Sequence, residues 1–206
     1  MNKGILVVVS GFSGAGKGTV MKSLLENYDN YALSVSVTTR RPRQGEEDGR
    51  EYFFRTKEEF ENLIKEDALI EYAQYVGNYY GTPRSYVEKM LEEGKDVILE
   101  IEIQGAMKIK EKIPDALLVF VAPPSVEELK NRLKGRGTET PEVIASRLHR
   151  AGEEAEGMEL YDYLLINDEL DACVKELHSI IRCEHARTSR NLSFIQKIKD
   201  ESGALL

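Results

Sequence analysis

Short apolar runs alternate along the chain with longer segments in which apolar residues recur every three or four positions. The runs Ile5–Val9, Val97–Ile103 and Leu117–Val121 are almost continuous in aliphatic residues, which is typical of strands buried on both faces. Two further runs, Leu33–Val37 and Tyr163–Ile166, complete a set of five predicted strands. Because helical segments lie between them, we expect an α/β protein with a mostly parallel five-stranded sheet flanked by helices. Ligands of such sheets bind beyond the carboxyl ends of the strands.

Capping residues predict where several of the helices begin. Thr82 is the expected N-cap of a helix whose first residue is Pro83 and which closes at Gly94. Residues 125–128, Ser-Val-Glu-Glu, form a capping box before a helix over Leu129–Lys134. Two more helices open at Thr56-Lys-Glu-Glu and at Thr140-Pro, with apolar stripes made of Phe60, Leu63 and Ile64 and of Ile144, Leu148 and Ala151, respectively.

Two stretches interrupt the simple alternation of strands and helices. Residues 36–95 form a long excursion rich in Tyr, Arg and Gly, which we expect to be a small inserted domain. Residues 134–140, Lys-Gly-Arg-Gly-Thr-Glu-Thr, are charged and glycine-containing, and we expect them to belong to a lid over about residues 132–150. The core domain then comprises residues 1–35 and 96–206.

The composition argues against several classes of protein. The 206 residues carry a net charge of −8, which disfavours broad binding to nucleic acid or to anionic membranes. No apolar run approaches the roughly 18 residues of a membrane span. The short N-terminal run does not resemble a signal peptide, so we expect a cytoplasmic protein. Cys173 and Cys183 form no recognisable metal motif with the three histidines. Near the C-terminus, Phe194, Ile195 and Ile198 predict an amphipathic docking helix.

A glycine-rich segment directly behind the first predicted strand carries the strongest chemical signal. Its sequence is Gly11-Phe-Ser-Gly-Ala-Gly-Lys-Gly-Thr19, and a helix is predicted over Lys17–Asn27. The glycines let backbone N–H groups surround phosphate oxygens, the helix dipole favours the same anion, and Lys17 can reach a terminal phosphate. A turn with a solvated lysine is the simpler alternative, but strand, spacing and helix together favour a phosphate-binding loop. The predicted phosphate-loop residues are Gly11, Ser13, Gly14, Ala15, Gly16, Lys17, Gly18 and Thr19.

One position departs from the usual phosphate-loop pattern. Ser or Thr normally follows the lysine and contacts Mg²⁺, whereas this chain has Gly18 there and carries the hydroxyl on Thr19. The backbone cradle is unaffected by this change. We therefore expect Mg²⁺ to be held mainly by phosphate oxygens and water, with Thr19 and Glu100 as candidate protein ligands.

Several further segments match a known family in order and spacing. They are residues 36–43 (Ser-Val-Thr-Thr-Arg-Arg-Pro-Arg), 45–52 (Gly-Glu-Glu-Asp-Gly-Arg-Glu-Tyr), 70–82 (Ile-Glu-Tyr-Ala-Gln-Tyr-Val-Gly-Asn-Tyr-Tyr-Gly-Thr) and 101–105 (Ile-Glu-Ile-Gln-Gly). Together with the phosphate loop they resemble guanylate kinases, from about Ile5 to Asp168. The resemblance implies a P-loop kinase fold in which residues 36–95 form an inserted GMP-binding domain.

The resemblance also assigns residues to the phosphate of GMP. It implies that Arg40 and Arg43 grip this phosphate, because guanidinium groups match phosphate oxygens and remain charged. Tyr52 and Tyr80 are implied to donate their phenolic hydroxyls to the same group. Taken alone, the arginines indicate a solvated basic turn and the tyrosines indicate packing, so these roles depend on the family match.

Glu71 is implied to read the guanine base. Its carboxylate can accept from both N1–H and the exocyclic amino group, a pair of adjacent donors that adenine lacks. The hydroxyls of Ser36 and Thr82 are implied to approach the base, although Thr82 is also an expected N-cap and the family often has serine there. Without the flanking match, Glu71 is more simply interpreted as a surface helix carboxylate.

Two acidic residues are predicted to end the third strand opposite the phosphate loop. These are Glu100 and Glu102, at positions where the family often has aspartates, and two residues apart on a strand they share one face. The resemblance implies that one faces the nucleotide and magnesium and the other the guanine side. We assign Glu102 to GMP, and the length of Glu is compatible with a water-mediated metal contact.

Arginines of the expected lid complete the predicted catalytic group. Arg136 and Arg147 resemble those that close over the transferred phosphoryl group, where positioning and charge neutralisation carry the reaction. With Lys17 they are the predicted catalytic residues. Arg132 and Arg150 are rivals for the role of Arg147.

The sequence therefore predicts an ATP:GMP phosphotransferase that produces ADP and GDP and also accepts dGMP. MgATP is expected on the phosphate loop, with Asn167-Asp168 on its adenine side, although Asn-Asp is also common in turns. Two alternatives remain: adenylate kinase, which shares the Gly-Lys-Gly-Thr ending, and a non-catalytic guanylate-kinase-like binding module. We expect no nucleic-acid or membrane partner, and no oligomeric state is predicted.

Overall fold

A five-stranded parallel sheet forms the core of the protein. The computed structural model describes residues 3–135 and 140–203. The strands lie in the order β2-β7-β1-β8-β9, and every neighbouring pair is parallel. Their bounds are Leu6–Gly11 (β1), Tyr31–Leu33 (β2), Asp96–Glu100 (β7), Leu117–Ala122 (β8) and Tyr163–Ile166 (β9). The predicted α/β class and five-stranded sheet are confirmed.

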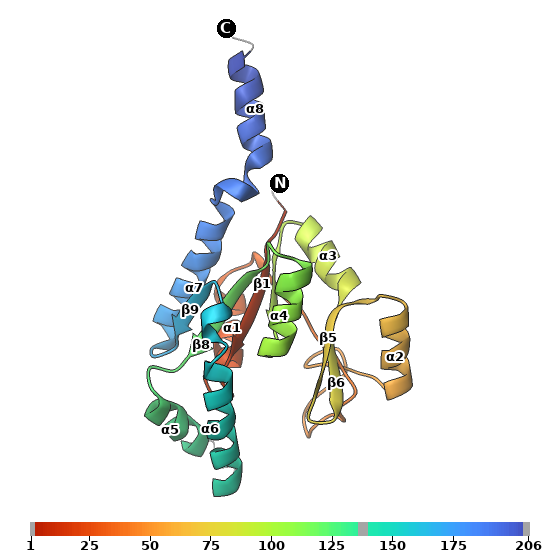
Figure 1. Ribbon diagram of the computed structural model, residues 1–206, viewed down its shortest axis with the longest axis vertical. Helices are drawn as coiled ribbons and strands as arrows, with labels where there is room; N and C mark the ends of the chain where they lie inside the picture. Colours follow the sequence, from red (N-terminus) through yellow and green to blue (C-terminus); the bar gives the residue numbers. More distant parts are fainter. Residues whose placement is uncertain (1–2, 136–139, 204–206) are drawn as a thin grey trace.

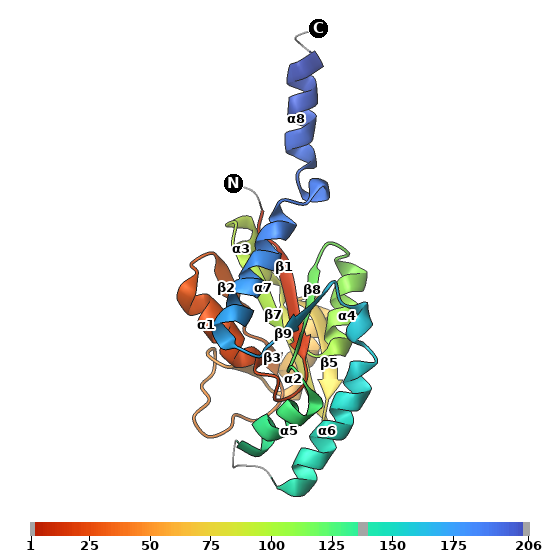
Figure 2. The same cartoon turned by 90° about the vertical axis from the view of Figure 1, so that its left-hand side faces the viewer.

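Alternate residues of β1 face the two sides of this sheet. Val7 and Val9 pack in one hydrophobic cluster with α1 (Lys17–Asn27) and α7 (Leu170–His185). Leu6 and Val8 pack in a second cluster with α3 (Arg84–Glu92) and α4 (Ile103–Lys112). Figures 1 and 2 show the sheet between these helices. Because both faces of β1 are covered, its residues from Leu6 to Val9 form an unbroken apolar run.

A second, four-stranded sheet lies beside α3 and α4 (Figure 1). Its order is β4-β3-β6-β5, and α2 (Lys57–Lys65) covers it through the buried ring of Phe60. Its strands are Val37–Thr38 (β3), Phe53–Phe54 (β4), Leu69–Tyr75 (β5) and Asn78–Pro83 (β6). The predicted start of α2 is confirmed, since Thr56 and Glu59 form a reciprocal capping box.

Two of the predicted strands are wrong in their extent. The run 33–37 is divided between the two sheets, because Ser34 N–H still donates to Ile98 of the core sheet, whereas the carbonyl of Ser36 accepts from Phe53 of the second sheet. The run 97–103 ends as a strand at Glu100, and Ile103 is already the first residue of α4.

The helix after Thr82 also begins differently from the prediction. Thr82 and Pro83 end β6, so Pro83 is the N-cap and α3 starts at Arg84. The Thr82 hydroxyl is bonded to Glu71 and does not cap the helix. The predicted end is confirmed, because Gly94 has a left-handed φ of 82° and its N–H donates to the carbonyl of Leu91.

Two helices contribute to the expected lid. They are α5 (Val126–Gly135) and α6 (Pro141–Ala155), and Ser125 and Thr140 accept the N–H bonds expected at their starts. The second hydrogen bond of the predicted capping box, from the backbone N–H of Ser125 to the Glu128 side chain, is not formed, because Glu128 binds Arg132 instead. The predicted stripe of α6 packs on the core cluster. Residues 136–139, including the predicted catalytic Arg136, lie outside the described residues.

The C-terminal segment leaves the body at the end of the sheet opposite α5 and α6 (Figures 1 and 2). After α7, a 3-10 turn (Thr188–Arg190) leads into α8 (Leu192–Gly203), and another 3-10 turn (Met158–Leu160) precedes β9. The predicted helix is present, but Phe194 and Ile198 are exposed, so it does not dock on its own chain. In the described ranges, no helix has the length and apolar character needed to cross a membrane.

Candidate active site

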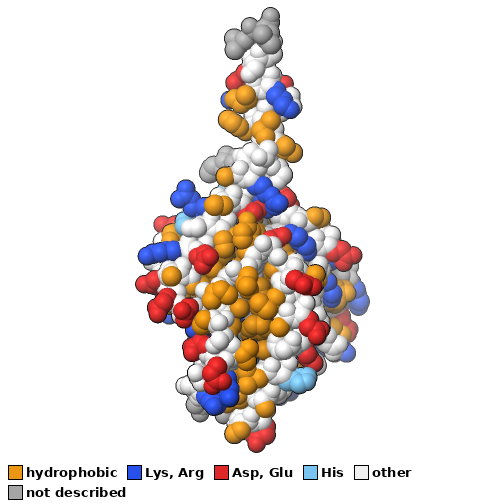
Figure 3. Space-filling view, turned by 60° about the vertical axis from the view of Figure 1, so that its left-hand side comes forward, with side chains coloured by type: hydrophobic (Ala, Val, Ile, Leu, Met, Phe, Trp, Pro, Cys, Tyr) orange, Lys and Arg blue, Asp and Glu red, His pale blue; other side chains and the backbone are white. Residues whose placement is uncertain are grey.

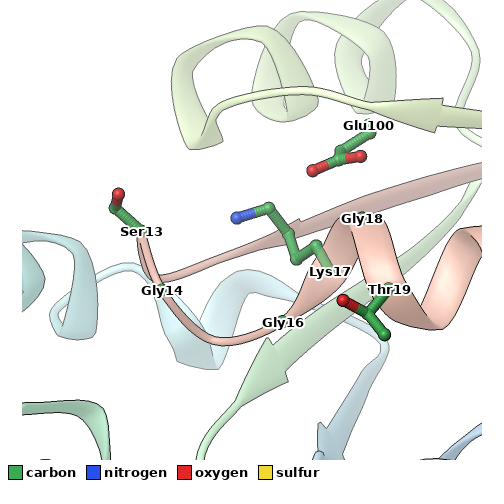
Figure 4. Close-up of a pocket in the computed structure, with 7 residues that line it drawn as sticks. All are labelled: Ser13, Gly14, Gly16, Lys17, Gly18, Thr19 and Glu100. Carbon is green, nitrogen blue, oxygen red and sulfur yellow. The ribbon is translucent and has the colours of Figure 1, made fainter. Parts of the chain in front are cut away.

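The phosphate loop connects the carboxyl end of β1 to the start of α1 and encloses a polar cavity. The cavity has a volume of about 390 Å³ and is open to solvent (Figure 4). Its lining is formed by Ser13, Gly14, Gly16, Lys17, Gly18, Thr19 and Glu100. The structure therefore brings most of the predicted loop residues together with Glu100 of the neighbouring strand β7.

At two positions of the loop, neighbouring atoms lie so close that only glycine fits. Gly16 has a φ of 91°, and a Cβ there would lie 2.4 Å from the side-chain nitrogen of Asn167. A Cβ on Gly11 would lie 2.1 Å from the carbonyl oxygen of Val121 in β8. Gly18 differs, because no atom lies within 4 Å of a Cβ added there. The departure from the usual motif at Gly18 is therefore not imposed by packing.

Lys17 lies over the loop in the first turn of α1. Its Nζ donates to the carbonyl oxygens of Gly11, at 2.7 Å, and Phe12, at 3.2 Å. These contacts hold the cation at the cavity, where Figure 4 shows it between Ser13 and Glu100. The position is suited to an anion bound by the loop.

Asn167 is buried behind the loop at the end of β9. Its side-chain amide donates to the carbonyl oxygen of Ala15 at 2.8 Å, which ties the loop to the sheet edge. Asp168, the other predicted adenine-side residue, follows it and is exposed.

Glu100 and Glu102 do not share a strand face, so that part of the prediction is wrong. Glu100 ends β7 and lines the loop cavity, whereas Glu102 is the N-cap of α4, at φ −74° and ψ 159°. Residue 103 already belongs to α4, so the two carboxylates are carried by different elements. Glu102 instead lies 3.6 Å from Arg150 of α6.

The oxygen donors at the cavity fit a hard cation. The Thr19 hydroxyl and the Glu100 carboxylate both line it, and Mg²⁺ prefers oxygen ligands together with water and phosphate. Within residues 3–135 and 140–203, no cluster of three or more His, Cys, Asp or Glu side chains could hold a metal ion. Among the described residues, the candidate ligands at the cavity are therefore hydroxyl and carboxylate oxygens.

The second sheet holds a buried carboxylate. Glu71 of β5 is 3% exposed, and its Oε1 accepts a 2.8 Å hydrogen bond from the hydroxyl of Thr82 on β6. Burial raises the pKa of Glu71, and the Thr82 bond partly offsets that rise. A Cβ on Gly105 would lie 3.0 Å from the other carboxylate oxygen, so α4 approaches closely. Ser36, the third residue predicted at the base, lies just before β3 and is half-buried.

Arg40 is fixed between the acid Glu46 and the aromatic rings of Tyr52 and Phe54. Its Nη2 lies 2.9 Å from Glu46 Oε1, and its guanidinium carbon lies 5.2 Å from the ring centre of Tyr52. The rings of Tyr52 and Tyr80 are 5.9 Å apart, and burial raises the pKa of Tyr52, so its phenol remains a hydrogen-bond donor. Three of the four residues predicted at the GMP phosphate therefore form one cluster.

Glu46 was missed by the sequence analysis. Its second oxygen accepts from the backbone N–H of Arg43 at 2.7 Å, so Glu46 orders the loop that carries both arginines. The Arg40 contact lowers the pKa of Glu46. The side chain of Arg43 itself is exposed. The sequence signal was an acidic residue close behind the arginine pair, a pattern also common in solvated loops.

Helix α6 brings two arginines to the two sides of the site. Arg147 Nη1 donates to the hydroxyl of Ser13 in the phosphate loop at 2.7 Å. Arg150 lies between Glu102 and Glu154, with its Nε donating to Glu154 Oε1 at 2.9 Å. Glu154 was also missed, although its spacing of four residues from Arg150 predicts contact on a helix. Arg132, the other rival, pairs with Glu128 on α5.

Comparison with known proteins agrees with this arrangement. The family model described as guanylate kinase matches residues 3–184. The guanylate kinase of Lactococcus lactis is 51% identical over 199 residues, which cover 96% of this chain and 97% of the relative. That of Caldanaerobacter subterraneus is 50% identical over 200 residues, covering 97% of both chains. The crystal structure of guanylate kinase from Anaplasma phagocytophilum superposes with a TM-score of 0.77 at 34% identity, over 92% of this chain and 90% of that one. The chain belongs to the guanylate kinase family.

Proposed function

We propose that the protein transfers the γ-phosphoryl group of MgATP to GMP, and also to dGMP, giving ADP and GDP or dGDP. The observation that carries the choice of acceptor is the buried pair Glu71–Thr82. A carboxylate can accept from both N1–H and the amino group of guanine, whereas adenine leaves one oxygen facing an acceptor. A buried carboxylate left partly unpaired loses about 1–3 kcal/mol, which favours guanine.

ATP occupies the phosphate loop in this proposal. Backbone N–H groups of the loop and the amino end of α1 bind its phosphates. Lys17 exchanges its contacts with the carbonyls of Gly11 and Phe12 for phosphate oxygens. Mg²⁺, when bound, supplies positive charge to the phosphate oxygens, and Thr19 and Glu100 are the residues that would hold it directly or through water. Asn167 keeps the loop in place, and Asn167-Asp168 border the adenine.

The phosphate of GMP is bound by Arg40, Arg43, Tyr52 and Tyr80. Glu46 acts as a positioning residue, because it holds the Arg40 side chain and the Arg43 backbone before the substrate arrives. Pre-organised arginines lose less conformational entropy on binding than mobile ones. No general base is required in principle, because the acceptor phosphate is largely ionised near neutral pH.

Closure brings the two nucleotides together in this proposal. Residues 36–95 form the GMP-binding unit, and the lid over about residues 132–150 supplies Arg136 and Arg147 to the moving phosphoryl group. In the present conformation Arg147 is engaged with Ser13 of the loop, so it is already near the phosphate site. Exclusion of water on closure limits hydrolysis of ATP.

The test is the formation of ADP from MgATP with GMP, dGMP, AMP, CMP and UMP offered separately. We expect turnover with GMP and dGMP and background rates with the other three. Turnover of AMP above that of GMP would retain the kinase activity but overturn the role of Glu71. A folded protein that binds neither nucleotide in a calorimeter would overturn catalysis and indicate a binding module.

A further inference from the structure

Charges of both signs are mixed over the surface of the molecule. Figure 3 shows Lys and Arg interspersed with Asp and Glu around a strip of hydrophobic side chains. Lys22, Lys57 and Lys89 each face a glutamate four residues later on the same helix, at 3.8–3.9 Å. Exposed pairs of this kind contribute little to stability. Lys108 and Lys112 of α4 differ from them, because both donate to backbone carbonyl oxygens of another element.

The element that these two lysines hold is β5. Lys108 Nζ donates to the carbonyl oxygen of Tyr72 at 2.6 Å, and Lys112 Nζ donates to that of Ile70 at 2.9 Å. The ammonium group of Lys108 also lies 5.4 Å from the centre of the Tyr72 ring. Figure 1 shows α4 beside β5. The two bonded carbonyls belong to the residues directly before and after Glu71.

Strand β5 is irregular at the position of Glu71. Leu69 pairs with Pro83 of β6 and Tyr72 pairs with Gly81, so residues 70 and 71 lie opposite Thr82 alone. Two residues opposite one form a β-bulge, which disrupts the ladder of hydrogen bonds and redirects a side chain. Because β5 is also the edge strand of its sheet, its outer backbone groups have no neighbouring strand. The lysines of α4 supply donors to this outer edge.

A single face of α4 meets the bulge. Gly105, Lys108 and Lys112 follow one another at spacings of three and four residues, which places them on one side of a helix. A Cβ on Gly105 would lie 3.0 Å from Glu71 Oε2, so the glycine allows the helix to approach the carboxylate. Burial raises the pKa of Glu71, whereas the Thr82 hydroxyl and the charges of Lys108 and Lys112 oppose that rise.

We propose that Lys108 and Lys112 are positioning residues for the guanine base. They hold the β5 bulge against α4 and thereby fix the direction of the ionised Glu71 carboxylate, which accepts from the two guanine donors. This inference rests on the proposed reading of guanine by Glu71. Each lysine holds a different carbonyl, so the loss of one leaves the strand attached to α4 through the other. Single variants should therefore fold but select the base less well.

Steady-state kinetics of Lys108→Met and Lys112→Met with GMP and with inosine monophosphate tests the proposal. The inosine nucleotide keeps N1–H but lacks the exocyclic amino group, so the comparison reports on the second guanine donor. We expect the preference in kcat/KM for GMP over the inosine nucleotide to fall by roughly 5- to 10-fold in each variant, with the KM for ATP within about twofold of wild type. Lys112→Arg retains a charged donor and should restore most of the preference.

Lys110→Met is the matched control on the same helix. Lys110 donates to the carbonyl of Ala116 and to Asp162, on the side of the core sheet, so its loss should leave the preference for GMP unchanged. Thermal unfolding of every variant verifies that it is folded.

Two further measurements separate positioning from a purely structural role. Removal of a nearby positive charge raises the pKa of Glu71 further, so the increase in the KM for GMP on acidification should begin at a higher pH in Lys112→Met than in wild type. In the Glu71→Gln background, Lys112→Met should cause no further change in the KM for GMP, because the lysine acts through the carboxylate.

The outcomes distinguish this inference from the proposed function. An unchanged preference in both lysine variants, together with weaker GMP binding in Glu71→Gln, would overturn the role of the lysines and retain that of Glu71. Unchanged GMP binding in Glu71→Gln would overturn the reading of guanine, and the role of the lysines with it. Equal losses for GMP and ATP, or additive effects of Lys112→Met and Glu71→Gln, would indicate a general loss of packing and would also overturn the positioning role.

Discussion

The hydroxyl of Thr82 donates a 2.8 Å hydrogen bond to Glu71 in a site where both side chains are almost fully buried. The two residues come from neighbouring antiparallel strands, β5 and β6, of the second sheet. The bond orients the Glu71 carboxylate and leaves its other oxygen toward α4. A buried, oriented acceptor of this kind discriminates between ligands by the hydrogen bonds that it would otherwise lose.

Replacement of Glu71 by Gln should weaken GMP binding far more than ATP binding. The amide can accept from only one of the two guanine donors and places its own NH₂ against the other. We expect the KM for GMP to rise by roughly 10- to 100-fold, the equivalent of about 1–3 kcal/mol, with the KM for ATP within about twofold of wild type. Steady-state kinetics with each substrate varied in turn measures both constants. Thr82→Ser keeps the hydroxyl and is the control. Equal losses for GMP and ATP would indicate damage to the fold.

The pH dependence of GMP binding should carry the signature of Glu71. Burial raises the pKa of this carboxyl above its ordinary value of 4.5. GMP requires the ionised form, so its KM should rise as the pH falls through that raised pKa, which begins at a higher pH than for an exposed Glu. The free energy of unfolding changes in the opposite sense. Folding favours the protonated form of Glu71, and the stability gained from that protonation is lost as the pH rises through the pKa of Glu71 in the folded protein.

A comparison with Glu71→Gln isolates this effect from the ionisation of GMP itself. The phosphate of GMP titrates in both proteins, whereas only the wild type has the carboxyl at position 71. The KM for GMP of Glu71→Gln, divided by that of the wild type, should therefore decrease as the pH falls. A ratio that is constant with pH would mean that Glu71 does not titrate in the binding site.

Lys17→Ala should abolish most turnover while the protein remains folded. Within the part of the chain that the structure describes, the amino group donates to the loop carbonyls of Gly11 and Phe12, so its removal affects charge stabilisation more than packing. We expect kcat to fall by roughly 10²- to 10³-fold, as for other lost transition-state contacts. Lys22→Ala, on the exposed face of the same helix, is the matched control. Near-normal turnover of Lys17→Ala would remove the residue from the mechanism.

Two glycines of the phosphate loop should respond oppositely to alanine. Gly16→Ala places a Cβ 2.4 Å from Asn167 at a positive φ, which forces Asn167 away from Ala15. We expect a loss of about 2 kcal/mol in the free energy of unfolding and weaker ATP binding. Gly18→Ala meets no neighbour and should be neutral, or stabilising by up to about 1 kcal/mol. Denaturant unfolding and calorimetry measure both quantities, and a destabilised Gly18→Ala would contradict the assignment of free space.

The core sheet and the phosphate loop could be predicted because their signals are local. Apolar runs buried on both faces and the spacing from Gly11 to Thr19 each specify a structure without reference to distant residues. The division of residues 33–37 could not be predicted, since Leu33 and Val37 are both apolar and the change of sheet is set by partners far along the chain. Strands β5 and β6 were missed because tyrosine and polar residues replace a clear alternation.

Residues that act through other residues were the ones that the sequence did not reveal. Glu46 and Glu154 are ordinary acidic residues until the fold places them against Arg40 and Arg150. The prediction for Glu102 failed for a related reason: two residues apart share a face only while the strand continues, and here a helix begins at residue 103. Partner identity in three dimensions, not residue type, decides these roles.

Arg150 should be coupled energetically to Glu154. Burial raises the pKa of Glu154, and one of its oxygens is buried without a hydrogen-bond partner. Arg150→Met removes the guanidinium that compensates this carboxylate, so we expect the free energy of unfolding to fall by about 1–3 kcal/mol at neutral pH. The loss should be smaller at acid pH, where Glu154 takes up a proton. Adding Glu154→Gln to Arg150→Met should recover part of the stability, because the uncompensated charge is then absent.

A double-mutant cycle on these two positions measures the coupling. The exposed pair Lys130 and Glu127 on α5, 3.7 Å apart, is the control and should couple by at most about 0.5 kcal/mol. Because Arg150 also faces Glu102 on the proposed GMP side, the KM for GMP should change in Arg150→Met while the KM for ATP does not. If the Arg150 and Glu154 substitutions are additive, the two residues do not form a functional pair, and the ion pair with Glu102 alone must account for any change in the KM for GMP.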